Sequence, residues 1–294
     1  MRFVTMILSI ASLWVAGAYA DIIGTADNFA VLAGSTVTNT GATTIGGALN
    51  VGVSPGTAVT GTSTLTLNGG VIDAANPTAV QAESDLTTAY DNLANLAITA
   101  DLTVPDAGNL GGLVLPSGVY KFDSTAQLTG KLTLDAQNNP DAFWVFQIGS
   151  QLTTASASSV VFENVAGGAT NMSLFWQVGS SAVLGTTTAF EGNIVALTSI
   201  SLDTGATIGC GRALARNGEV SLQGNTLDTG CSVIGSPSSG NDLSGVAITS
   251  GAGGGTTLSP VPEPRTTPVL LGLCIVVLVV SQIKRIKAKT ASQI

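Results

Sequence analysis

Between residues 21 and 234 the chain alternates short apolar runs, rich in Val, Ile and Leu, with positions occupied by Ser, Thr and Gly. A period of two between apolar and polar positions is typical of β-strands that bury one face. Similar segments recur at spacings of roughly twenty or thirty residues, beginning at residues 146, 176, 196 and 216. Repeats of this length predict a mainly β solenoid, in which each coil buries its inward side chains against its neighbours.

One segment has helical rather than strand periodicity. Asn76 can act as the N-cap, and Pro77 suits the first helical position. The apolar residues that follow alternate spacings of four and three, which predicts a helix over about residues 77–97 with one apolar stripe packed along a larger body. These stripe residues are Ala82, Leu86, Ala89, Leu93 and Leu96. Because a coil-like segment also precedes Pro77, the helix interrupts the solenoid and lies on one flank.

The N-terminus has the order of a secretory signal peptide. A basic start precedes an apolar run from Phe3 to Val15, and residues 18–20 have the small-x-small form of a cleavage site. We therefore assign residues 1–20 to the signal and start the mature chain at Asp21. An N-terminal membrane anchor is the alternative, which the length disfavours because a spanning helix needs about 20 apolar residues.

The C-terminal part changes composition twice. Residues 235–261 are rich in Gly, Ser, Thr and Pro, which predicts a flexible linker after a folded domain over 21–234. A Pro-Glu-Pro motif, an apolar stretch and a basic end follow, and residues 262–294 are similar to the bacterial sorting tails built from these three parts. An ordinary single-pass anchor is the alternative. In either case we expect a transmembrane helix, with the basic end in the cytoplasm and the folded domain outside.

The exported part carries little positive charge. Residues 21–259 contain four Lys and Arg against seventeen Asp and Glu, which gives a net charge near −13. This balance excludes nucleic acid as a partner, because affinity for it rests on neutralising phosphates. It also disfavours electrostatic docking to anionic lipid. We therefore expect contact with a membrane only through the C-terminal segment.

The chain has three cysteines and no histidine. Cys210 and Cys231 lie in the exported part, so we predict a disulfide between them, with two buried free thiols as the alternative. Two sulfurs alone do not complete a tetrahedral metal site, so we expect no metal and no cofactor. Acid–base catalysis would fall to carboxylates, Lys or Tyr, and the carboxylates are dispersed beside turns rather than paired. We therefore predict that the protein is not an enzyme.

The many Thr and Ser residues point to another kind of surface. Neighbouring strands lie about 4.7–4.9 Å apart and alternate residues along a strand about 6.6–6.8 Å apart, so a flat face of a β-solenoid presents a two-dimensional grid. Water molecules in ice also form such a grid. Thr suits this contact because its methyl group orders water, its hydroxyl joins the lattice and its β-branched side chain is stiff before binding. Charge is not needed on such a face and would be harmful there.

Seven segments in order resemble blocks of the microbial ice-binding protein family, and together they cover most of residues 27–227. Among them are FAVLAGSTVTNTGATTIGG, NPDAFWVFQIGSQLTT and LFWQVGSSAVLGTTTAFEGNIVALTSI. The resemblance implies a right-handed β-helix of triangular section, a long α-helix along one side and an N-terminal coil inserted next to the last coil. It also implies one flat face that adsorbs to ice, lowers the freezing point and inhibits recrystallisation.

Some members of that family carry a Thr-Ala/Gly-x-Thr/Asn motif on the ice-binding face. Residues 40–43 and 204–207 match it. Because residues three apart in a regular strand point to opposite sides, Thr204 and Thr207 share a face only if Gly205 bends the chain. The predicted ice-contacting residues, taken from the motifs and from similar positions in other coils, are Thr40, Thr43, Thr154, Ser156, Thr186, Thr188, Thr204, Thr207 and Thr226.

These observations predict a secreted or surface-tethered ice-binding protein, a monomer whose partner is the ice crystal surface. Two rival functions use the same β-helix. A surface adhesin or structural protein would bind polysaccharide or another cell, and a glycan array beside an ice-recrystallisation assay would separate it from an ice-binding protein. A carboxylate-dependent polysaccharide lyase or hydrolase would lose turnover when one acid is mutated, and the dispersed acids disfavour it.

Overall fold

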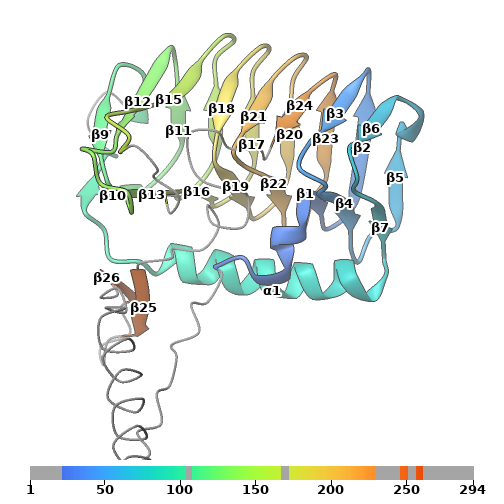
Figure 1. Ribbon diagram of the computed structural model, residues 1–294, viewed down its shortest axis with the longest axis horizontal. Coiled ribbons are helices and arrows are strands. Elements are labelled where there is room, and N and C mark those ends of the chain that lie inside the picture. The colour runs from blue at the N-terminus through green and yellow to red at the C-terminus, as the bar shows by residue number, and fades with distance from the viewer. Residues whose placement is uncertain (1–21, 104–107, 167–171, 229–245, 251–255, 261–294) are drawn as a thin grey trace, which may run out of the picture. The chain divides into compact units, whose positions relative to one another are not determined.

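The structure, a computed structural model, describes residues 22–103, 108–166, 172–228, 246–250 and 256–260. Most strands in these ranges belong to three parallel sheets, here called sheets A, B and C, which wind around one hydrophobic core as a β-helix (Figure 1). The solenoid predicted from the repeat pattern is therefore confirmed.

A full coil of the β-helix contributes one strand to each sheet, in the order A, B, C. Sheet A has nine strands, in the spatial order β7 (Ile72–Ala74), β4 (Asn50–Val53), β1 (Phe29–Ala33), β22 (Ala213–Ala215), β19 (Asn193–Ala196), β16 (Ser173–Val178), β13 (Phe143–Ile148), β10 (Gly118–Phe122) and β8 (Ala100–Asp101). Sheet B has seven, β11 (Ala126–Leu128), β14 (Leu152–Thr154), β17 (Ala182–Leu184), β20 (Ile200–Leu202), β23 (Val220–Gln223), β2 (Thr36–Thr40) and β5 (Ala58–Thr60). Sheet C has eight, β6 (Leu65–Leu67), β3 (Thr43–Ile45), β24 (Thr226–Asp228), β21 (Thr207–Gly209), β18 (Ala189–Glu191), β15 (Ser159–Glu163), β12 (Lys131–Asp135) and β9 (Val114–Pro116).

The first coil of the chain lies beside the last one. In sheet A, β1 is placed between β4 and β22, and Val31 pairs in parallel with Ala213. An ion pair ties this junction to the short 3-10 helix η1 (Gly24–Asn28), because Arg212 Nη2 lies 2.6 Å from Asp27 Oδ1 and the Arg212 side chain is only 3% exposed. The insertion that the family resemblance implied is therefore confirmed.

Aromatic side chains stack along the inside of the β-helix. The rings of Phe146 and Trp176 are 4.1 Å apart and nearly parallel, and Tyr120 and Phe190 extend the stack at 5.6 and 4.8 Å. Each such pair contributes about 0.5–1.5 kcal/mol beyond the burial of its area. The stack connects three successive coils through their interiors.

The predicted helix is present as α1 (Pro77–Ala94) and packs on the outer face of sheet A (Figure 1). The Asn76 side-chain oxygen accepts a 2.9 Å hydrogen bond from the Ala79 N–H, as an N-cap should. All five predicted stripe residues are buried. They pack in one cluster with outward apolar side chains of sheet A, which are Phe29, Leu32, Val119, Val145, Phe175, Val195 and Leu214.

The helix ends three residues earlier than predicted. Asn95 is the C-cap, and its N–H bonds to the Asn92 carbonyl. Leu96 stays buried at 4% exposure, so its place in the apolar stripe is right although it lies beyond the last turn. The reason is that the chain must straighten to join sheet A, where the Thr99 N–H donates to the Val119 carbonyl at 2.7 Å.

Within the segment predicted to be a linker, β25 (Val246–Ser250) and β26 (Thr256–Pro260) form a separate two-stranded sheet. The predicted signal peptide and the predicted sorting tail over 262–294 lie outside the described residues. Over the part of the chain that the structure describes, no helix is both long and apolar enough to cross a membrane.

Candidate functional site

The outer face of sheet B carries one row of aligned side chains, here called the central row. In six of the seven strands the row position lies between two residues that point inward, and in β5 it follows the inward Val59, so alternation turns its side chain outward. The strand register places these outward residues opposite one another from coil to coil. From β5 to β11 the central row consists of Thr60, Thr38, Ser221, Ser201, Val183, Thr153 and Gln127.

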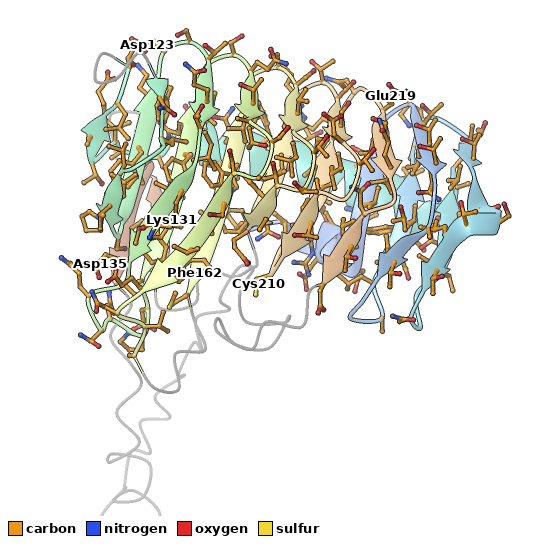
Figure 2. All side chains as sticks on the ribbon, turned by 90° about the horizontal axis from the view of Figure 1, so that it is seen from above. Asp123, Lys131, Asp135, Phe162, Cys210 and Glu219 are labelled. Carbon is orange, nitrogen blue, oxygen red and sulfur yellow. The ribbon has the colours of Figure 1, made fainter. Side chains whose placement is uncertain are left out.

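Sheet B differs from the other faces in charge. None of its seven strands contains Asp, Glu, Lys or Arg. The strands of sheet C contain Lys131, Asp135, Glu163, Glu191 and Asp228. In Figure 2, Lys131 and Asp135 lie on one side of the coils, away from Glu219, which directly precedes β23 at the border of sheet B. Since α1 covers much of sheet A, sheet B is the open face without charges in its strands.

Sheet C also holds a carboxyl group that titrates far from its usual range. Burial raises the pKa of Glu191 to about 7. Glu191 pairs in register with Gly209, where an added Cβ would lie only 2.7 Å from the carboxyl oxygens. A face with such a group changes charge near neutral pH, whereas the strands of sheet B have no group that could do so.

The turns between sheets B and C, here called the B–C edge, need left-handed backbone conformations. Each of seven successive turns has one residue with positive φ, between +54° and +88°. Five of these residues are glycines, for which this conformation is easy, but Ala157 and Thr187 also adopt it. The positive-φ glycines of the edge are Gly41, Gly61, Gly130, Gly205 and Gly224.

Four of the predicted ice-contacting residues lie exposed on the B–C edge: Thr40, Ser156, Thr186 and Thr204. Gly205 does bend the chain, with φ +71°, as the motif requires. The bend nevertheless separates the two threonines of the motif, because Thr204 stays at the edge while Thr207 belongs to sheet C.

Three predicted contacts are wrong, because their side chains point into the β-helix. Thr43 and Thr188 are 0% exposed and Thr154 is 7% exposed. Thr154 comes two residues after the buried Leu152 in β14, so alternation directs it inward. Thr43 precedes the buried Ile45 by the same spacing. Side chains that point inward and expose at most 7% of their surface cannot form the contact with an ice crystal.

The two remaining predicted contacts, Thr207 and Thr226, are on the outer face of sheet C and pair with each other. Thr207 is half-buried and Thr226 is exposed. Their register continues through Thr44 to Thr66, which makes a row of four threonines.

The sequence prediction missed most of the central row. Thr38, Thr60, Thr153, Ser201 and Ser221 are all outward residues of sheet B that were not among the predicted contacts. The signal that would have found them is local. In a segment such as Ile-Ser-Leu (200–202) or Leu-Thr-Thr (152–154), the middle residue is on the side opposite to its two buried neighbours.

Cys210 follows β21 and is disulfide-bonded. Its predicted partner, Cys231, lies outside the described residues, so the pairing of these two cysteines stays a prediction. Within the described ranges, no three His, Cys, Asp or Glu side chains gather in a way that could hold a metal ion.

The chain resembles known proteins over the whole β-helix. A model of the Ice-binding-like family matches residues 31–228. The ice-binding protein of Nostoc sp. (strain HG1) is 49% identical over 211 residues, which cover 72% of this chain and 75% of that protein. The crystal structure of an ice binding protein from an Antarctic Biological Consortium matches with a TM-score of 0.63 and 44% identity, covering 70% of this chain and 90% of that one. That of the ice-binding protein from the Antarctic ascomycete Antarctomyces psychrotrophicus matches with a TM-score of 0.64 and 38% identity, covering 70% and 97%. The chain therefore belongs to the Ice-binding-like family.

Proposed function

We propose that this protein adsorbs to ice through the outer face of sheet B together with the B–C edge. The observation that carries the proposal is the absence of charged residues from all seven strands of this open face. Relatives that are themselves ice-binding proteins support the activity. We expect thermal hysteresis and inhibition of ice recrystallisation, and we expect no enzymatic turnover.

The central row supplies the contacts that such adsorption needs. Its positions repeat at the spacing between strands, about 4.7–4.9 Å, and five of its seven residues carry a hydroxyl group. The Ser221 hydroxyl donates to the Ser201 hydroxyl at 3.0 Å, so these side chains are already ordered without ice. Pre-ordered side chains lose little entropy on binding, which favours many weak contacts over a flat area.

The threonine row of sheet C is the second candidate surface. It aligns Thr66, Thr44, Thr226 and Thr207, and it includes two of the contacts predicted from the sequence. The row continues through Ala189 and Ser159 to Lys131. Glu191 and Asp228 stand two positions along the same strands. Those charges would keep a hydration shell between the crystal and this face. We therefore rank it below sheet B, whose strands contain no charged residue and whose B–C edge contains one, the half-buried Asp203.

The sequence supports a proposal for how the protein is exported and attached. We propose that residues 1–20 are removed as a signal peptide, that 235–261 link the domain to its tail and that 262–294 sort it to, or anchor it at, the cell surface. We also propose a Cys210–Cys231 disulfide and a monomeric, right-handed β-helix of triangular section. A single flat face per molecule suffices for adsorption, so no second subunit is needed.

Lysine substitutions on three faces test the assignment. Ser201→Lys places a long charged side chain in the middle of the central row, Thr207→Lys does the same on sheet C, and Thr88→Lys changes an exposed residue on α1 as the matched control. We expect Ser201→Lys to abolish thermal hysteresis and ice shaping, while the other two variants keep both.

Circular dichroism and melting temperatures check that all three variants fold. Loss of hysteresis in Thr207→Lys, with retention in Ser201→Lys, would move the ice-binding face to sheet C. Full activity in both variants would show that neither face is the ice-binding surface, and absence of hysteresis in the wild type would refute the proposed function. A Lys at Thr188, which is fully buried, would unfold the domain and cannot serve in this test.

A further inference from the structure

Six buried polar residues lie just inside the B–C edge and are here called the corner network. They are Asn39, Thr43, Thr154, Ser158, Thr188 and Asn225, and none is more than 7% exposed. A buried hydroxyl or amide is costly unless it is hydrogen-bonded. Each of the six makes hydrogen bonds to groups of the same edge, although the Asn39 side-chain oxygen has no partner among the described residues.

The clearest part of the corner network is a chain of three hydrogen bonds between two turns. The Gly185 N–H donates to Thr154 Oγ1 at 2.9 Å, Thr154 Oγ1 and Thr188 Oγ1 are 2.8 Å apart, and Thr188 Oγ1 donates to the Ala155 carbonyl at 3.2 Å. Each hydroxyl has one proton. Since Thr188 gives its proton to Ala155, Thr154 must be the donor to Thr188, and the chain has one direction.

The neighbouring turns are tied in the same way. Ser158 Oγ donates to the Leu128 carbonyl at 2.9 Å and accepts from the Gly130 N–H at 3.3 Å. The Asn225 side chain donates to the carbonyls of Asp203 and Ala206, both at 2.9 Å. Each link therefore joins the backbone of one turn to a side chain of the adjacent coil.

The exposed hydroxyls of the B–C edge project from the backbone that this network holds. Ser156 stands between Thr154 and Ser158, and Thr186 stands between Gly185 and Thr188. The same two turns contain the edge's left-handed residues that are not glycine, Ala157 and Thr187. A left-handed conformation is unfavourable for residues with a side chain, so without the network these two turns would relax.

We propose that the corner network is a positioning element for ice adsorption, which keeps the edge hydroxyls in register with the central row. The proposal rests on the proposed function, because it assumes that the B–C edge is part of the ice-contacting surface. Thr43, Thr154 and Thr188 are thus positioning residues that act through the turns above them, without touching ice.

Two serines offer a matched pair for the test. Ser158→Ala removes one donated and one accepted hydrogen bond under the B–C edge. Ser117→Ala removes the same pair of bonds elsewhere, where Ser117 Oγ donates to the Phe143 carbonyl at 2.8 Å and accepts from its N–H at 2.9 Å. Because Ser158 is buried and Ser117 is half-buried, a purely structural role predicts that hysteresis falls in each variant only as far as its melting temperature falls. We expect Ser158→Ala to lower thermal hysteresis about threefold or more, because loosened side chains must be ordered on binding, and Ser117→Ala to leave it unchanged.

A second pair of variants separates the hydroxyl of Thr188 from its shape. Thr188→Val keeps the branched shape and removes the hydroxyl, whereas Thr188→Ser keeps the hydroxyl and removes a methyl group. We expect hysteresis to fall in the Val variant and to be retained in the Ser variant. Measurements near 0 °C, with folding checked by circular dichroism at the same temperature, keep the comparison among folded proteins.

These outcomes separate a failure of the positioning role from a failure of the proposed ice-binding surface. If Ser201→Lys abolishes hysteresis while Ser158→Ala and Thr188→Val retain it in full, the positioning role is wrong and the proposed surface stands. If hysteresis instead falls with melting temperature in both serine variants alike, the positioning role is also wrong. If Ser201→Lys itself leaves hysteresis intact, the sheet B surface fails and the positioning role fails with it.

Discussion

Glu83 gives the stability of this protein a dependence on pH that the wild-type chain and one variant should reveal. The residue lies on α1, and its Oε1 atom is buried without a hydrogen-bond partner among the described residues. Burial raises the pKa of its carboxyl group from 4.5 to about 8, although the nearby Arg216 guanidinium acts to lower it. The Nε atom of Arg216 is likewise buried without a partner in the described part of the chain. The folded protein therefore favours the neutral form of Glu83.

The direction of the effect follows from the proton balance. Between pH 4.5 and about 8 the folded state keeps a proton on Glu83 that the unfolded chain has lost. The free energy of unfolding must therefore fall as pH rises. The contribution of Glu83 is complete below pH 4.5 and is lost as pH rises through about 8. At about 1.4 kcal/mol per pKa unit, the loss is on the order of a few kcal/mol.

Urea unfolding of the wild type and of Glu83→Gln at pH 5 and pH 9 measures this loss. Gln cannot ionise. The free energy of unfolding of the variant, relative to that of the wild type, should therefore be higher at pH 9 than at pH 5 by a few kcal/mol. Glu191, with its pKa raised to about 7, titrates in both proteins and cancels in the difference. Glu163→Gln, which removes an exposed carboxylate, is the control. An equal stability difference between wild type and Glu83→Gln at both pH values would refute the reasoning.

Two further predictions concern the backbone of the B–C edge and the junction of the first and last coils. An added Cβ at Gly61 would lie 1.8 Å from the Asn39 carbonyl oxygen, whereas at Gly130 nothing lies within 4 Å, and both residues have positive φ. Gly130→Ala should therefore cost only about 1–2 kcal/mol of backbone strain, while Gly61→Ala should lower the melting temperature much further, and equal losses would contradict the clash. Asp27→Asn removes a negatively charged partner of the buried Arg212 guanidinium and should cost about 2 kcal/mol or more in urea unfolding; an unchanged midpoint would show that the ion pair does not stabilise the junction.

The sequence was sufficient for the elements whose signals are local. The stripe from Ala82 to Leu96 is buried as predicted, because residues spaced three and four apart all lie on the same face of a helix. The end of α1 was harder to place. Leu96 fits the apolar spacing of the stripe although it lies beyond the end of the helix. Its side chain packs in the same apolar contact from the turn that leads to sheet A. Pairing of the first coil with the last came only from the family resemblance, since no local pattern encodes contacts so distant in the chain.

The candidate site was predicted less well, and the left-handed turns explain why. A strand pattern keeps its phase only while the backbone stays extended. A single left-handed residue, such as Thr187, rotates the chain, so Thr186 points out and Thr188 points in although they are two residues apart. Thr fits both situations, because its methyl group packs in a core and its hydroxyl bonds to a turn or to water. The residue type alone could not separate them.

The distribution of charged residues identifies the ice-binding face better than that of threonines does. Threonines occur both inside the β-helix and on its outer faces. Inside the β-helix, Thr154 and Thr188 form hydrogen bonds with buried backbone groups. On the outer face of sheet C, the row from Thr66 to Thr207 lies beside carboxylates. Counting threonines therefore cannot choose among the faces. A charged side chain, in contrast, cannot be placed inward without a partner, so it must occupy an outward position wherever the fold tolerates it. Residues 21–259 include seventeen acidic residues, yet no strand of sheet B contains a charged residue. Adsorption to the uncharged ice lattice requires such a face.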